Sequence, residues 1–224
     1  HGQSAPMPAR PWAVSALETA GIPHAVAGGN AVAAWVAKSD WAAFLERFLA
    51  IPAAADDAIV PSPLMPHLLL HWLRDRAISR YQPLPVGIEA PRELAGVPWQ
   101  RVGDDGSRYV SFAEWMCPVN CIEPRICPHT RGVRDWDMSR TAAVAPGLDA
   151  AAVLHCTHRT YGVGMIDVQD VQAADAVVTR TVAARGADSG RGGAAVRILV
   201  GTVSNCHGAL GVLRVGGSPV ARTE

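Results

Sequence analysis

Residues 115–137 read WMCPVNCIEPRICPHTRGVRDWD, and this stretch sets the organisation we expect for the rest of the chain. It contains three of the five cysteines of the protein, Cys117, Cys121 and Cys127, in a Cys-x3-Cys-x5-Cys spacing. The prolines among these cysteines prevent a regular helix, so the stretch is predicted to be an irregular loop. Thiolates are soft ligands that suit iron–sulfur clusters and zinc. We therefore expect an irregular cysteine-rich insertion that holds a metal centre.

The spacing leaves the identity of the metal open. It matches neither the common ferredoxin patterns nor the paired Cys-x2-Cys of zinc ribbons. The first expectation is an iron–sulfur cluster, such as a [4Fe–4S] cluster, with a redox or small-molecule role. The alternative is zinc in a zinc-stapled structural or binding module, and free thiols or a redox disulfide are the third. A closed site needs a fourth ligand, for which His129, Cys156 and Cys206 are candidates; either distant cysteine could instead be a small buried hydrophobe.

A cluster that keeps one position open predicts a different role for the neighbouring side chains. His158 and His207 are then the candidate catalytic residues, as an acid or base beside the open position. No reaction follows from these residues, so the sequence does not decide whether the protein is an enzyme.

The composition predicts a packed protein with no affinity for polyanions. The chain has 224 residues, 49% of them hydrophobic and 18% charged, and its formal net charge is zero. Zero net charge gives no electrostatic reason to bind nucleic acid or an anionic membrane. No apolar run approaches the roughly 20 residues of a membrane helix. A small molecule or a redox protein is the expected partner, and the seven tryptophans are compatible with a homo-oligomer.

The five cysteines favour a reducing compartment. An odd number excludes complete disulfide pairing within one chain. Three clustered and two dispersed cysteines fit a metal site in the cytoplasm better than an extracellular disulfide framework. His1 is expected to be a tag remnant or a numbering choice; the alternative is a processed end that chelates copper.

The pattern of apolar residues predicts an α/β fold with a Rossmann-like mixed sheet in two halves. Residues 1–100 form the first half, 101–150 the cysteine-rich insertion and 151–224 the second half, unless all three form one continuous domain. A hairpin is expected to lead from the Asp-Asp-Gly turn at 104–106 into the insertion. The expected helices cover 12–20, 31–48, 66–77 and 170–184, and the expected strands cover 24–27, 57–61, 151–158, 161–168, 196–204 and 209–215.

Gly28, Gly29 and Asn30 form a glycine turn between an expected strand and an expected helix. Such a turn directs backbone N–H groups toward a phosphate, which makes a nucleotide-sensing domain an alternative function. Close helix–strand packing explains the same glycines without a ligand. The segment GIPHAVAGGNAVAAWVA resembles the opening of bacterial nucleotidyltransferase-like proteins. That family needs an Asp-x-Asp pair, whereas this chain has adjacent acids at Asp56 and Asp57, so nucleotidyl transfer is not expected.

His67 and His71 lie four residues apart and therefore on one face of the helix expected at 66–77. A metal could use this pair. Because the glutamate of the zinc-protease pattern is missing, we favour a structural role, with one histidine as a cap or hydrogen-bonding group and the other packed beside Trp72.

The combination of PSPLMPH…W, CPVNCIEPRICPHT and a later CHG resembles uncharacterised bacterial proteins. In those proteins a nucleotide-binding-like α/β half accompanies a Cys-Pro-rich cluster. The resemblance implies a shared site with Cys117, Cys121 and Cys127 at its core. It implies no substrate and no reaction.

Overall fold

The computed structural model describes residues 24–29, 32–37, 40–61, 67–118, 120–160, 163–188 and 194–217. The chain divides into two compact units, residues 1–50 and residues 51–224. The boundaries expected at residues 100 and 150 both fall inside the second unit. The helix expected at 12–20 lies outside the described residues.

The first unit contains a hairpin and a helix. Strand β1 (His24–Gly29) pairs antiparallel with β2 (Val32–Ala37), so that Gly29 lies opposite Val32. Helix α2 (Trp41–Leu49) follows; the Asp40 carboxylate accepts a hydrogen bond from the Ala43 N–H at 3.1 Å and thereby caps the helix. The helix expected at residues 31–48 is therefore wrong for residues 32–37, which form a strand, and is confirmed from Trp41 onward. Its first part, VAAWVA, carries valine and tryptophan, which favour a strand, and the Gly-Gly-Asn sequence before it favours a hairpin.

This correction removes the structural basis of the nucleotide hypothesis. Gly28 and Gly29 end a strand that returns as another strand, so they do not precede a helix N-terminus. Asn30 lies outside the described residues.

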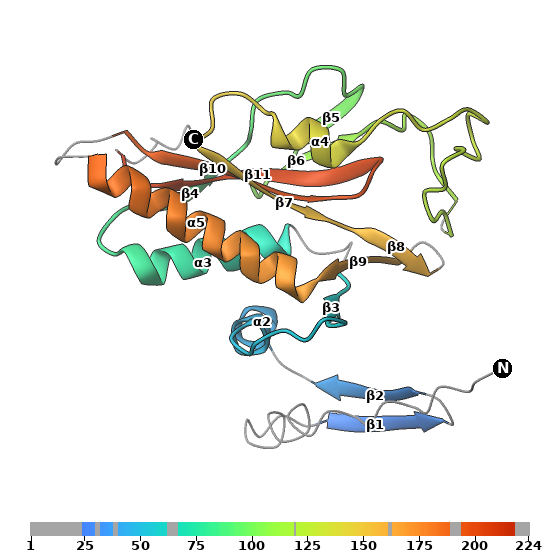
Figure 1. Cartoon of the computed structure of the whole chain (residues 1–224), viewed down its shortest axis with the longest axis horizontal. Coiled ribbons are helices and arrows are strands. Elements are labelled where there is room, and N and C mark those ends of the chain that lie inside the picture. The colour runs from blue at the N-terminus through green and yellow to red at the C-terminus, as the bar shows by residue number, and fades with distance from the viewer. Residues whose placement is uncertain are drawn as a thin grey trace. The chain divides into compact units, whose positions relative to one another are not determined.

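A six-stranded mixed sheet organises the second unit (Figure 1). Its order is β5-β6-β11-β10-β7, and β4 pairs with β11 beyond the end of β6. The pair β10–β7 is parallel, and the other described pairs of this sheet are antiparallel. The strands are β4 (Val86–Glu89), β5 (Trp99–Val102), β6 (Arg108–Ser111), β7 (Ala150–His155), β10 (Val196–Val203) and β11 (His207–Val215).

A second, three-stranded sheet in the same unit has the order β3-β9-β8 and is antiparallel throughout. Its strands are β3 (Ala58–Ile59), β8 (Thr157–Thr160) and β9 (Val163–Asp167). Because β8 follows β7 after the single residue Cys156, the segment around this cysteine joins the two sheets.

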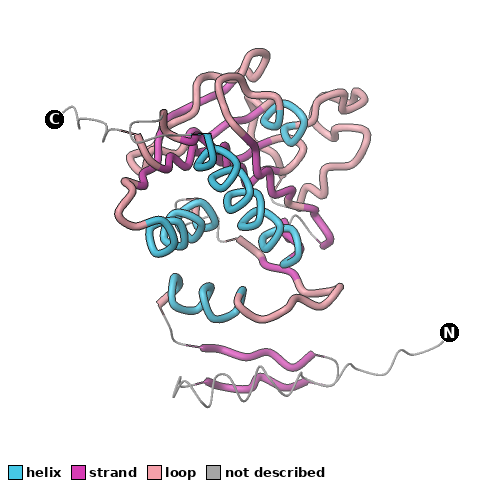
Figure 2. The backbone as a smooth tube through the Cα atoms, turned by 60° about the vertical axis from the view of Figure 1, so that its left-hand side comes forward, coloured by secondary structure: helices cyan, strands magenta, loops and turns pink. Residues whose placement is uncertain are grey.

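Helices cover both faces of the large sheet (Figures 1 and 2). Helices α3 (Leu68–Tyr81) and α5 (Val168–Asp188) lie on one face, and α4 (Met138–Ala143) lies on the other. The core on the α4 side consists of fully buried apolar side chains from the helix, the strands and a loop: Leu94, Val97, Val110, Met138, Ala142, Leu199, Val203, Leu210 and Val212.

The fold is thus mixed α/β, as expected, and the predicted 104–106 hairpin and both long helices of this unit are confirmed. The described strands do not show the mainly parallel, doubly wound order that a Rossmann-like sheet has. Among the described residues, no helix is long and apolar enough to cross a membrane.

Candidate functional site

The cysteine-rich loop runs from the end of β6 to the start of α4, and short backbone contacts shape its second half. An isolated antiparallel bridge joins Ile126 and Val133. Inside it, the Cys127 N–H donates to the Gly132 carbonyl at 2.9 Å, and the Arg131 N–H donates to the Cys127 carbonyl at 2.8 Å. Arg131 has a φ of 58°, which closes this tight turn. Cys127 therefore sits at the base of a small, closed turn.

The turn stabilises Cys127 as a thiolate. The Thr130 N–H hydrogen-bonds to its sulfur and lowers the pKa of the thiol. Burial opposes this shift, but the Thr130 hydroxyl, the His129 N–H and the Arg134 guanidinium add to the lowering. Backbone N–H groups that converge on one atom favour an anion there. Cys127 is thus prepared for the charge state that a metal ligand needs.

Cys117 and Cys121 are partly exposed and lie within electrostatic reach of Cys127. Burial raises the pKa of the Cys117 thiol, and negative charge on Cys121 and Cys127 raises it further. The three thiols therefore influence one another across the loop. Within the described residues, however, no three Cys, His, Asp or Glu side chains already surround one point as a ligand set.

Glu123 anchors the loop to the large sheet. Its carboxylate, 3% exposed, accepts hydrogen bonds from the Ser204 hydroxyl at 2.6 Å, the Asn205 N–H at 2.8 Å and the Cys206 N–H at 3.2 Å. Burial alone would raise the pKa of Glu123, but the Ser204 and Asn205 hydrogen bonds and two nearby histidines hold it below its ordinary value. The turn between β10 and β11 therefore binds a charged carboxylate from the loop.

The two histidines beside Glu123 are His158 and His207, both singled out from the sequence. His158 Nδ1 lies 3.7 Å from Glu123 Oε2, and His207 Nε2 lies 3.8 Å from Glu123 Oε1. Burial lowers the pKa of His207, which favours its neutral form. The parallel pair β7–β10 places His155 opposite Val203. His158 comes three residues after His155 and His207 comes four residues after Val203, so the pairing brings the two histidines to the same end of the strands.

Cys156 and Cys206 lie on the sheet side of Glu123. Burial raises the pKa of Cys156 to about 12 and that of Cys206 to about 11, and the Glu123 charge contributes to both shifts. The Trp136 indole N–H donates to the Cys206 sulfur at 3.3 Å. Both residues are therefore protonated thiols near neutral pH, and their pKa values are shifted in the direction opposite to that of Cys127.

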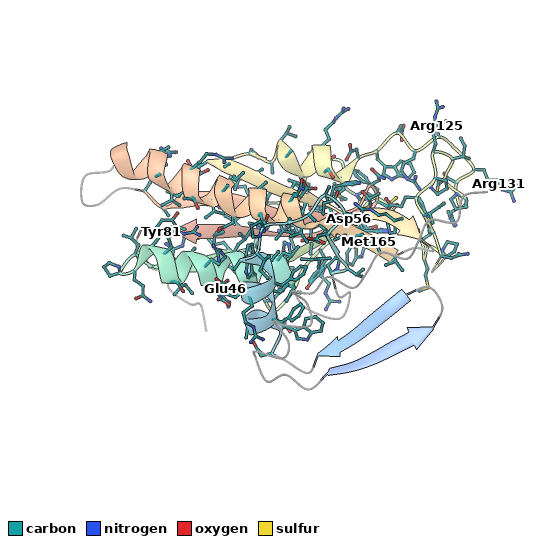
Figure 3. All side chains as sticks on the ribbon, turned by 60° about the horizontal axis from the view of Figure 1, so that its bottom comes forward. Glu46, Asp56, Tyr81, Arg125, Arg131 and Met165 are labelled. Atoms are coloured by element: carbon teal, nitrogen blue, oxygen red, sulfur yellow. The ribbon has the colours of Figure 1, made fainter. Side chains whose placement is uncertain are left out.

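His129, the remaining candidate ligand, lies exposed on the loop. Its ring stacks on Trp115 with centroids 4.5 Å apart and an interplanar angle of 7°. Because Trp115 comes two residues before Cys117, this stack ties the two ends of the cysteine cluster together. Figure 3 shows Arg125 and Arg131 projecting outward from the same loop.

The sequence did not identify Glu123 as an anchor. The available signal was a carboxylate enclosed between two cysteines, but its partners lie about 80 residues away in the chain. Its φ of 51° marks the same position as conformationally unusual.

These features define a mixed α/β protein in which a cysteine-rich loop is fastened to strand ends by a buried glutamate. Residues 69–216 match the model of the AF_1314_C family, described as "Uncharacterized protein, C-terminal domain". Because the match spans more than half of the chain, the protein belongs to this family. The matched region contains all five cysteines. No curated protein and no solved structure gives a significant match.

Proposed function

We propose that Cys117, Cys121 and Cys127 hold one metal centre, with an iron–sulfur cluster as the first assignment, and that this centre has a redox or small-molecule role. The observation that carries the proposal is the mutual influence of three thiols in one irregular loop, where backbone donors already favour the Cys127 thiolate. Three thiolates within electrostatic reach of one another repel, and a bound cation removes that repulsion.

The anchoring of the loop supports the same proposal. A ligand loop without regular structure needs fixed points, since each unrestrained residue costs about 1–2 kcal/mol of backbone entropy to order. Glu123 supplies one fixed point through its three hydrogen bonds to the β10–β11 turn. The stack of Trp115 on His129 supplies another. Metal binding then orders a loop that is already partly held.

The neighbouring histidines favour a role beyond simple structural support. Three cysteine ligands leave one position of a cubic cluster open to a small molecule. His158 and His207 flank the Glu123 carboxylate next to this loop. We assign them as the acid or base groups beside the open position, with Glu123 as the residue that orients them.

Anaerobic purification followed by iron, sulfide and zinc analysis and an ultraviolet–visible spectrum tests the proposal. We expect iron and sulfide in the wild type and their loss in Cys121→Ser. Met116→Ser is a matched control from the same loop, because Met116 is 95% exposed and has no ligand atom of comparable strength. A folded, colourless wild type that contains neither iron nor zinc would falsify the proposal.

One observation favours zinc as a second candidate. The stack holds the His129 imidazole against Trp115, two residues before Cys117, and His129 could complete a Cys3His set. This candidate predicts one tightly bound zinc per chain, its loss in His129→Ala, and loss of loop structure on chelation. Retention of metal in His129→Ala argues against this ligand set.

A further inference from the structure

A second group of metal-ligating side chains lies at the start of α3, on the face of the large sheet that α3 and α5 cover. The His71 N–H donates to the His67 carbonyl at 3.1 Å, so the two histidines follow each other by one helical turn. Both were favoured as structural residues from the sequence. In the structure the His67 ring has a single hydrogen-bond partner, Thr202, and the His71 ring faces only the more distant carboxylate of Asp105.

His67 is 4% exposed, and its Nε2 lies 2.9 Å from the Thr202 hydroxyl. Its Nδ1 is buried and has no hydrogen-bond partner among the described residues. Burial lowers the pKa of His67 to about 3, so its ring is neutral and one of its two nitrogens carries a lone pair. In the tautomer whose Nε2–H donates to Thr202, that nitrogen is Nδ1. A buried polar atom without a partner calls for an explanation such as an ion or an ordered water.

His71 repeats this pattern beside a carboxylate. Its Nε2 is buried without a hydrogen-bond partner in the described part of the chain and lies 3.9 Å from Asp105 Oδ2. Ser107 fixes that carboxylate by donating from its N–H at 3.2 Å and from its hydroxyl at 2.8 Å. The carboxylate thus faces the histidine but is too far away to satisfy it.

We propose that His67, His71 and Asp105 bind a divalent transition metal of borderline softness, with Zn²⁺ as its simplest representative. Two imidazole nitrogens and one carboxylate oxygen are a common donor set for such ions. The Thr202 hydroxyl fixes the His67 ring through its other nitrogen, as ligating histidines require. The ion would satisfy both orphaned nitrogens at once, and it would leave a fourth position open.

Binding requires the donors to move closer. The three side chains do not already surround one point as a ligand set. Donor atoms bound to a tetrahedral Zn²⁺ at about 2.0–2.1 Å lie roughly 3.3 Å from one another, so the 3.9 Å gap between His71 Nε2 and Asp105 Oδ2 must shorten slightly. His71 is 28% exposed on its side chain and Asp105 is 13% exposed and lies in a hairpin turn, so both can rotate toward a common point.

A Zn²⁺ titration by calorimetry on the full chain tests this site, in a background where Cys117, Cys121 and Cys127 are serine. Removing these thiols separates the outcome from that of the cysteine-loop proposal. We expect one equivalent of bound zinc, and about a tenfold or greater loss of affinity in His71→Gln and in Asp105→Asn. His155→Gln is the matched control, because His155 already has a partner in the Ser139 hydroxyl at 2.7 Å.

Absence of zinc binding in the serine background overturns the proposal and assigns the orphaned nitrogens to an ordered water. Equal affinity in His71→Gln and in the unsubstituted background overturns it as well. Thermal unfolding with and without zinc gives a second readout: zinc should raise the Tm of the background and of His155→Gln by more than it raises that of Asp105→Asn. A rise of the same size in Asp105→Asn contradicts the site.

Discussion

At the scale of single residues, Glu123 links the cysteine loop to the rest of the protein. Its three hydrogen bonds reach a turn that is distant in sequence, and both flanking histidines lie within 4 Å of its carboxylate. The residue combines a buried charge with a left-handed backbone conformation. Such a combination persists only when the surroundings fix it firmly.

Glu123→Gln tests this link. The amide keeps the shape of the side chain but removes its negative charge. Three donors face that charge: the Ser204 hydroxyl and the N–H groups of Asn205 and Cys206. The free energy of unfolding should therefore fall by about 1–3 kcal/mol. Urea denaturation measures the change, with Glu114→Gln as an exposed control from the same loop. Equal stability of the two variants would show that Glu123 does not anchor the loop.

At the scale of elements, close contact between β10 and β11 depends on glycine. A Cβ on Gly208 would lie 2.4 Å from Val203 Cγ1 and 2.9 Å from the Thr202 carbonyl oxygen, and a strand backbone cannot easily move. A Cβ on Gly87 in β4, which also pairs with β11, would meet only the end of Arg214 at 3.9 Å.

Gly208→Ala should therefore destabilise the protein by about 1–3 kcal/mol through overpacking, while Gly87→Ala should have little effect. Because Gly208 follows the turn that binds Glu123, the same variant should also weaken metal retention by the loop. Denaturant midpoints of the two variants measure the first effect. Matched midpoints contradict the close-packing explanation.

Helices α3 and α5 are joined by a charged cluster. Asp175 of α5 lies 3.0 Å from Arg76 and accepts two hydrogen bonds from Arg80, at 3.1 and 3.0 Å. Burial would raise the pKa of Asp175, but the hydrogen bonds from Arg80 and Arg76 hold it below the ordinary value of 3.8. The folded state therefore binds this proton less readily than the unfolded state does.

The sign of the pH dependence follows from that shift. A lowered folded pKa gives stability that is fully present above the ordinary value of 3.8 and is lost as the pH falls through the folded value. Asp175→Asn should cost roughly 1–3 kcal/mol at neutral pH, and its difference from the wild type should shrink below about pH 3.8. Unfolding curves at several pH values measure this, and a constant difference at acidic pH contradicts it.

At the scale of the whole molecule, three segments that are remote in sequence contribute side chains to the candidate site. The large sheet beside them has an apolar core of its own. The loop contributes its three cysteines and Glu123, the β7–β8 segment contributes His158, and the β10–β11 turn contributes His207. The buried strands β10 and β11 form the core with apolar side chains of their own.

Metal removal should therefore loosen the loop and leave the sheet intact. After chelation under reducing conditions, hydrogen exchange should speed up within residues 112–137 and stay unchanged in β10 and β11. Exchange detected by mass spectrometry on peptides from both regions measures this. Faster exchange throughout the chain would contradict an independent sheet and favour the zinc-stapled alternative.

Local patterns predicted most elements of the second unit, because amphipathic periodicity and strand-forming runs are local properties. The failure at residues 32–37 has a local cause as well: the alanines there favour a helix, the valines and the tryptophan favour a strand, and hairpin pairing decides. The short helix α4 was not predicted, because six residues carry too little periodic signal.

The candidate site was predictable in part. The spacing of Cys117, Cys121 and Cys127 alone singled out the loop, and the strand ends singled out the Cys-His groups at 155–158 and 206–207. Their meeting point at Glu123 was not predictable, because it depends on which strands pair. The orphaned nitrogens of His67 and His71 likewise appear only once the sheet and α3 are packed together.

The most direct measurement of the central claim is the metal content per chain of anaerobically isolated wild type and of Cys127→Ser, determined side by side. Cys127 is the thiol that its turn most clearly prepares as a thiolate. We predict bound iron with matching sulfide in the wild type and a marked loss of both in the variant. Equal metal content in the two proteins, with the variant folded, would contradict a centre at the cysteine loop.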